Sequence, residues 1–166
     1  MSFNSFVHNG QTFDFAHLNS FSLSVPHRET TYSVLVNFSC HCFTEKFDET
    51  SDMPPYTHRN EVRTFNIKRY GLSKSLRSII EEHANKKVFF TRNSNYLIVS
   101  TDNEEKYAIF FDLKRERTGA HHVVLTVASA YLKDALPKHL DKINFRILIA
   151  KIATGQQVRS PYHHQR

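Results

Sequence analysis

Strand-like segments follow one another closely in the second half of the chain, and their spacing constrains the fold more than any other feature. They are rich in β-branched and aromatic residues, and turn-forming stretches such as Asn93-Ser94-Asn95 separate them. Short connections favour antiparallel neighbours, because a parallel pair needs a crossover of about a dozen residues or more. The predicted strands are residues 87–92, 96–100, 106–113, 122–131 and 143–153.

One amphipathic helix is predicted before these strands, over residues 73–85. Leu76, Ile79 and Ile80 recur at helical spacing, with charged residues between them, and Ser73 is the expected N-cap. The sequence thus predicts an α+β fold in which one main helix packs on an antiparallel sheet of about five strands.

An N-terminal β-hairpin is predicted around Asn9-Gly10, because both central residues of a type I′ turn need positive φ. A serine-rich connection broken by Pro26 and a polar loop over residues 45–60 follow. We expect one domain over residues 1–155 and a flexible basic tail over 156–166. Expected core residues are Val34, Val36, Phe38, Leu76, Ile79, Ile80, Phe110, Leu125, Val127, Ile147 and Ile149.

The segment from Tyr32 to Cys42 alternates as a strand does. Its apolar face carries valines, Phe38 and both cysteines, while Asn37, Ser39 and His41 line the opposite face. A regular strand directs His41 away from the cysteines, and no second cysteine pair exists. No metal site and no cofactor are therefore predicted, and the row of polar groups is read either as a solvated face or as a ligand site.

Further candidate site residues lie on the late strands. His122 begins one strand, and Ser129 and Tyr131 lie at its exit. Arg146 lies in a segment otherwise fit for burial, so it needs an anion or a carboxylate partner such as Asp112. Arg115 and Arg117 add positive charge nearby.

Composition excludes several classes of protein. Four glycines are too few for a nucleophile elbow, a phosphate-cradling loop or a dinucleotide fold. No run approaches the roughly 18 apolar residues of a membrane span. Two cysteines suit a reducing compartment, so a cytoplasmic protein is expected. The net charge of +6 attracts phosphate-rich partners, and 11 histidines supply possible acids and bases.

Residues 73–153, with Val-Val-Leu-Thr-Val-Ala-Ser-Ala-Tyr at 123–131, resemble the small metal-free ribonucleases of the barnase, EndoU, colicin and RelE group. Those domains place a Ser or Thr and an aromatic residue on a late strand beside His, Arg or Lys. The chain departs from that pattern in having no clear catalytic glutamate on a strand and an extra N-terminal hairpin. Most of the chain, with residues 32–44 and 110–131 as the most distinctive stretches, also resembles small prophage and plasmid proteins of the stationary-phase growth adaptation type.

The ribonuclease resemblance implies a metal-independent endoribonuclease, as a toxin or phage-encoded growth modulator. In this hypothesis His41 and His122 exchange protons, Arg146 and Arg115 hold phosphate, and Ser129 and Tyr131 orient the substrate. Arg117, Asn37 and Ser39 would contribute to substrate binding. The alternative is a non-catalytic module that binds nucleic acid or protein, so the expected partners are RNA or another phosphate-rich ligand, a protein antidote or a host protein.

Overall fold

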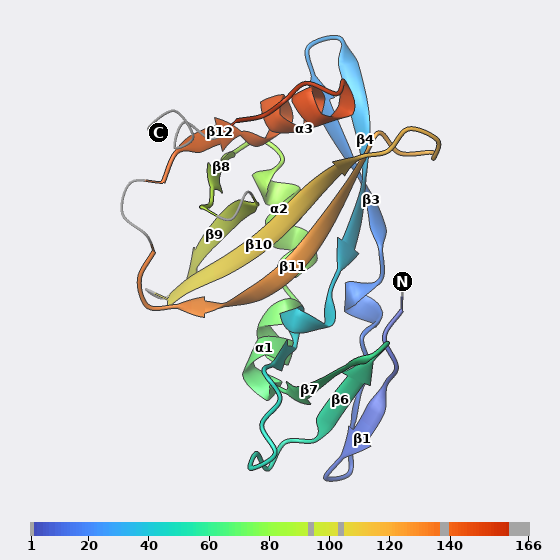
Figure 1. Ribbon diagram of the computed structural model, residues 1–166, viewed down its shortest axis with the longest axis vertical. Helices are drawn as coiled ribbons and strands as arrows, with labels where there is room; N and C mark the ends of the chain where they lie inside the picture. Colours follow the sequence, from blue (N-terminus) through green and yellow to red (C-terminus); the bar gives the residue numbers. More distant parts are fainter. Residues whose placement is uncertain (1, 93–94, 103–104, 137–139, 160–166) are drawn as a thin grey trace.

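A curled, seven-stranded mixed sheet forms the larger part of the protein, in a computed structural model that describes residues 2–92, 95–102, 105–136 and 140–159 (Figure 1). The strand order is β12-β8-β9-β10-β11-β4-β3. Neighbours are antiparallel except for β11 and β4, which are parallel. The strands are β3 (Phe21–His27), β4 (Thr30–Phe38), β8 (Lys87–Phe90), β9 (Tyr96–Asp102), β10 (Glu105–Arg115), β11 (Val123–Lys133) and β12 (Lys142–Asn144).

This sheet overturns the prediction of an antiparallel sheet of five strands with one main helix. The serine-rich segment before residue 30 is strand β3, in which Phe21, Leu23 and Val25 are buried and the intervening serines are exposed. Pro26 is tolerated because β3 is an edge strand. β3 and β4 then join the late strands through the parallel pairing of β4 with β11, a long-range contact that local turn signals do not predict.

A smaller unit, which contains β1 (Phe6–His8), β6 (Pro55–His58) and β7 (Glu61–Phe65), is drawn at the bottom of Figure 1. Asn9 and Gly10 both have positive φ and join the two strands of the predicted hairpin, which is confirmed. Aromatic side chains fill the space between this hairpin and a three-stranded sheet. The other elements are β2 (Gln11–Phe13) and β5 (Thr44–Glu45), with short 3-10 helices η1 (Ala16–Leu18) and η2 (Cys40–Cys42).

The predicted helix over residues 73–85 corresponds to α2 (Leu76–His83), and a helix that was not predicted, α1 (Ile67–Ser73), precedes it. Leu76, Ile79 and Ile80 are buried, as expected from their spacing. Ser73 is not an N-cap. It lies buried at the end of α1, where its hydroxyl donates to the Tyr70 carbonyl.

The predicted strand over residues 143–153 is wrong, because the segment is mainly helix α3 (Phe145–Ala153). The Asn144 side chain accepts a hydrogen bond from the Arg146 amide and starts the helix. Phe145, Leu148 and Ile149 are buried at helical spacing. Ile147 is 40% exposed and so lies outside the core.

Two further expectations concern membrane-spanning segments and the C-terminal tail. Within the described residues, no helix is long and apolar enough to cross a membrane. Of the predicted tail, residues 160–166 lie outside the described part of the chain.

Candidate functional site

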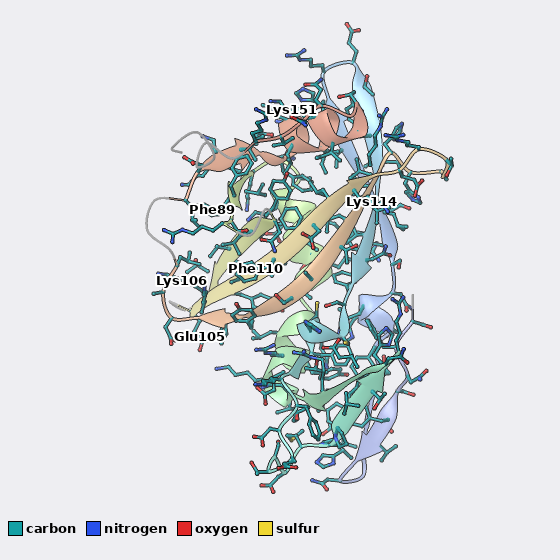
Figure 2. All side chains as sticks on the ribbon, in the orientation of Figure 1. Phe89, Glu105, Lys106, Phe110, Lys114 and Lys151 are labelled. Atoms are coloured by element: carbon teal, nitrogen blue, oxygen red, sulfur yellow. The ribbon has the colours of Figure 1, made fainter. Side chains whose placement is uncertain are left out.

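One face of the large sheet carries a strip of aromatic and basic side chains. Tyr107 points to the side of α2, where it lines a cavity with Ile79. Side chains alternate along β10, so Lys106 and Phe110 point to the opposite side, which we call the open face. Figure 2 labels both residues there, together with Phe89.

The register aligns this strip across five strands. Lys142 pairs with Phe89, Phe89 with Leu97, Leu97 with Phe110, and Phe110 with Ser129, and cross-strand partners share a face. Two residues before Phe110 on β10, Ala108 pairs with Tyr131. Two residues before Ala108, Lys106 pairs with Lys133. These pairs therefore form successive rows on the open face.

Each of the three half-buried aromatic rings on the open face has a basic group within about 6 Å of its centroid, the range of cation–π attraction. Arg69 from α1 lies 5.0 Å from the Tyr131 ring centroid, Lys133 lies 5.7 Å from that of Phe110, and Lys142 lies 5.1 Å from that of Phe89. The Phe110 and Tyr131 rings are stacked with centroids 5.6 Å apart. We call these six residues and Lys106 the aromatic–basic strip.

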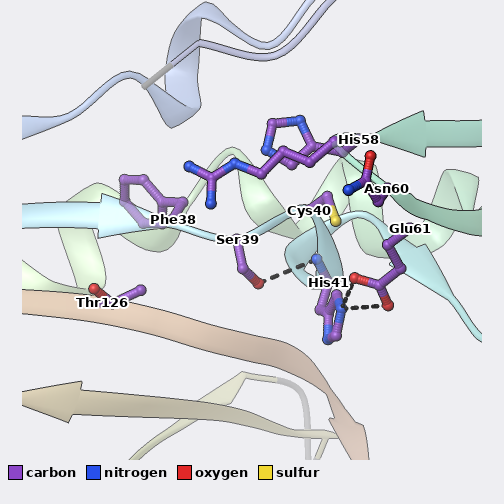
Figure 3. A pocket seen from close by; sticks show the side chains of 9 residues that line it. Phe38, Ser39, Cys40, His41, His58, Asn60, Glu61 and Thr126 are labelled. Carbon is purple, nitrogen blue, oxygen red and sulfur yellow. Dashed lines mark hydrogen bonds and ion pairs between the residues drawn. The ribbon is translucent and has the colours of Figure 1, made fainter.

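A pocket of about 460 Å³ lies where β4 ends, and we call it the His41 pocket (Figure 3). The His41 ring lies beside Glu61, with Nε2 at 3.0 and 3.1 Å from the two carboxylate oxygens. A carboxylate only accepts hydrogen bonds, so Nε2 carries the proton. The pocket is lined by Phe38, Ser39, Cys40, His41, His58, Arg59, Asn60, Glu61 and Thr126.

Local structure places His41 in this pocket. β4 ends at Phe38 instead of continuing to Cys42, and residues 40–42 turn as η2. The Ser39 hydroxyl accepts from the His41 amide and donates to the Ala128 carbonyl, at 3.2 and 2.6 Å. Ala128 is the residue that β11 carries without a partner where the register with β10 shifts. The end of β4 and the register shift in the neighbouring strand β11 therefore together fix the position of His41.

The electrostatics of the His41 pocket follow from hydrogen bonding and burial. The hydrogen bond from His41, assisted by Arg63, lowers the pKa of the Glu61 carboxyl below its ordinary value. Burial, with Arg59 assisting, lowers the pKa of His58, so its ring is neutral at neutral pH. Burial raises the pKa of the Cys40 thiol.

The structure brings some of the predicted site residues together. Ser39 and His41 meet in the His41 pocket, and Ser129 and Tyr131 lie on the open face. Asn37 lies on β4, where its side-chain oxygen accepts a hydrogen bond from Ser20.

The other predicted site residues lie elsewhere. The amide of His122 bonds the Ser33 carbonyl, at the opposite end of β4 from His41, so roughly 17 Å of strand separates the two histidines. Arg146 lies in α3, and no ion pair joins it to Asp112 among the described residues. His41, His122 and Arg146 therefore do not share one site.

Arg115 and Arg117 lie at the same end of β11 as His122. Nη1 of Arg115 approaches Gly155, just after α3, so closely that an added Cβ would lie 2.5 Å from it. Arg117 is exposed between β10 and β11, and its amide donates to the Glu116 carboxylate. Neither arginine reaches the His41 pocket or the aromatic–basic strip.

Sequence reasoning missed Glu61, His58 and Arg69 as site residues. Glu61 and His58 flank a tight turn at Arg59, whose φ is 54°, and this turn brings both to the pocket. No pattern in the sequence distinguishes Arg69 from the other basic residues around it. Its contact with Tyr131 depends on α1 packing near β11, which the local sequence does not reveal.

Comparison with known proteins identifies one family. The YjaZ family matches residues 5–153, from just before β1 to the end of α3. No curated protein matches the chain, and no solved structure matches it. Because the match spans most of the sequence, the chain belongs to the YjaZ family.

Proposed function

We propose that the protein binds single-stranded RNA on the open face of its large sheet. The observation that carries this proposal is the aromatic–basic strip, in which three rings each have a lysine or arginine beside them. Unpaired bases stack on aromatic side chains, and basic groups contact the phosphates between them. A duplex hides its base faces, so the strip suits a single strand.

Charges on the open face also indicate the direction in which a bound RNA strand lies. Lys106 and Lys133 form one cross-strand pair and stand at one end of the strip. The exposed Asp112, paired with Thr126, stands two positions beyond Phe110 at the other end. Phosphates of the RNA are attracted to the lysine pair and repelled by Asp112. The bound RNA should therefore run along the rows from Lys142 toward Lys133.

Binding is tested with a fluorescently labelled single-stranded RNA in EDTA, by fluorescence anisotropy. Each stacked base contributes about 1–3 kcal/mol, so Tyr131→Ala and Phe110→Ala should each weaken binding by about 5- to 150-fold. The matched control is Phe47→Ala, which removes a phenylalanine that is 48% exposed in a loop of the smaller unit. Wild-type affinity in both strip variants, or no binding by the wild type, contradicts the proposal; equal affinity for DNA removes the preference for RNA.

A second candidate function, cleavage of the bound RNA, is supported by the His41 pocket. Cleavage through the 2′-hydroxyl needs a base, an acid and a cation beside the phosphate. His58, kept neutral by its surroundings, can take the proton, and His41 can donate one from Nδ1 when its ring is protonated and Glu61 holds its Nε2–H. Arg59 lines the same pocket and supplies positive charge.

Cleavage is tested by incubating RNA with the protein in EDTA and looking for 2′,3′-cyclic phosphate ends. His41→Ala and His58→Ala should each reduce the rate by at least about 100-fold, the usual effect of losing a general acid or base. His8→Gln, in the N-terminal hairpin and outside the pocket, should not change it. Intact RNA with the wild-type protein leaves binding as the function.

A further inference from the structure

We propose that Cys40, His41 and Glu61 form a binding site for a divalent transition metal ion of the zinc type. One sulfur, one imidazole nitrogen and one carboxylate oxygen from these residues lie within 4.8 Å of one another. Among the described residues, this is the one group of three or more cysteine, histidine and acidic side chains that close. The site goes beyond RNA binding and uses no residue of the aromatic–basic strip.

The turn at the end of β4 creates this donor set. On a regular strand Cys40 and His41 would point to opposite faces, and that expectation argued against a metal. In η2 the two residues turn toward the same side, and β7 contributes Glu61 from the smaller sheet. Zinc bonds to these donors are about 2.0–2.3 Å long, so the three groups need to close by only about 1 Å around an ion.

A hydrogen-bond chain already orients two of the three donors. Arg63 Nη1 donates to Glu61 Oε1 at 2.9 Å, and Arg63 Nε donates to the Thr44 hydroxyl at 2.8 Å. That hydroxyl donates to the Cys40 carbonyl at 2.7 Å. Glu61 Oε2 takes no hydrogen bond from Arg63, so it is the oxygen that the metal would bind in place of its contact with His41 Nε2. Groups that orient ligands in this way are typical of protein metal sites.

The donor types select the ion. A thiolate and an imidazole favour zinc or cobalt over magnesium and calcium, which take oxygen ligands. The thiolate and the carboxylate together balance the charge of a divalent ion. Three protein ligands leave a fourth position, and the His41 pocket, with its volume of about 460 Å³, offers room for water or a small anion there.

Metal binding would also change what His41 does. The ion takes the nitrogen lone pair of His41 that a proton would otherwise occupy, so His41 no longer exchanges protons. Any cleavage that depends on His41 should therefore stop when the site is filled, whereas RNA binding on the open face should continue.

The test is a titration of the full-length protein with Co²⁺ after removal of metals by EDTA and dialysis. Thiolate-bound Co²⁺ gives a sulfur-to-cobalt charge-transfer band in the near ultraviolet. It also gives bands in the visible range, and the intensity of these bands reports tetrahedral geometry. One equivalent should bind, and Zn²⁺ should displace it. Cys40→Ser should lose the charge-transfer band, and Glu61→Gln should weaken binding at least about tenfold.

The matched control is Cys42→Ala, because Cys42 lies in the same turn but outside the donor set. It should keep the charge-transfer band. Circular dichroism verifies folding, and if Cys40→Ser unfolds, His41→Gln replaces it and should weaken binding by at least the same factor. The proposal is overturned if the wild type shows no charge-transfer band, or if Cys42→Ala loses the band while Cys40→Ser keeps it. RNA binding in EDTA, measured on the same variants, reports the proposed function separately.

Discussion

At the scale of single residues, the position of Glu61 explains most of what is unusual about the His41 pocket. Its carboxylate lies between a histidine and an arginine, and the turn at Arg59 brings it there from β7. The same carboxylate orients His41 in the cleavage hypothesis and provides an oxygen ligand in the metal hypothesis. A change at Glu61 therefore affects both.

Glu61→Gln should lower the free energy of unfolding at pH 7 in EDTA by less than about 1 kcal/mol, because the pair is largely exposed. The pKa of Glu61 is lowered in the folded state, so its ionic stabilisation is present above the ordinary glutamate pKa of about 4.3. That stabilisation is lost as the pH falls through the folded-state value. The difference between variant and wild type should thus shrink below about pH 4.3.

Urea unfolding across this pH range measures the effect. Glu49→Gln is the control, because Glu49 is an exposed loop glutamate. If the stability of both variants follows the wild type in parallel from pH 7 down to about pH 2, the His41–Glu61 contact does not stabilise the fold.

At the scale of elements, α2 attaches to the large sheet through few side chains. Ile80→Ala should destabilise the protein by about 2–5 kcal/mol, since the removed atoms leave a cavity under the helix. Glu82→Ala, on the exposed side of the same helix, should change stability by less than about 0.5 kcal/mol. Thermal unfolding of both variants decides the matter, and similar melting temperatures would mean that α2 contributes little to the core.

Elements with a clear period or turn signal were predictable from the sequence. Asn9-Gly10 gave the hairpin, and Ile79 and Ile80 gave the buried face of α2. The segment from Phe145 to Ala153 was not assigned correctly, because Ile147 and Ile149 satisfy a strand period as well as a helical one. Only the cap formed by Asn144 favours the helix, and it is a single residue.

Long-range pairing was less accessible than local structure, and it determines the candidate sites. The parallel contact of β4 with β11 places His41 and His122 at opposite ends of the strand pair. The sequence predicts Tyr131 as a candidate site residue, and its neighbours Arg69 and Phe110 come from other elements. A sequence pattern indicates which side chains share a face, and only the register shows which faces meet.

At the scale of the whole molecule, the net charge of +6 by itself attracts RNA, so this general attraction must be distinguished from binding at the aromatic–basic strip. Each phosphate neutralised on a single strand contributes about −0.7 to the slope of log K against log salt. The four basic side chains of the strip predict a slope of about −3 for a short RNA. Lys106→Gln with Lys133→Gln should make the slope about 1.4 less steep, because two phosphate contacts are lost.

A matched double variant separates the strip from the total charge. Lys46→Gln with Lys151→Gln removes the same two charges, from a loop of the smaller unit and from α3, both away from the open face. Anisotropy titrations at several salt concentrations should give the wild-type slope for this control and the shallower slope for the Lys106 and Lys133 pair. Equal reductions in both double variants would show that the RNA responds to net charge alone, in which case the aromatic–basic strip does not position the phosphates.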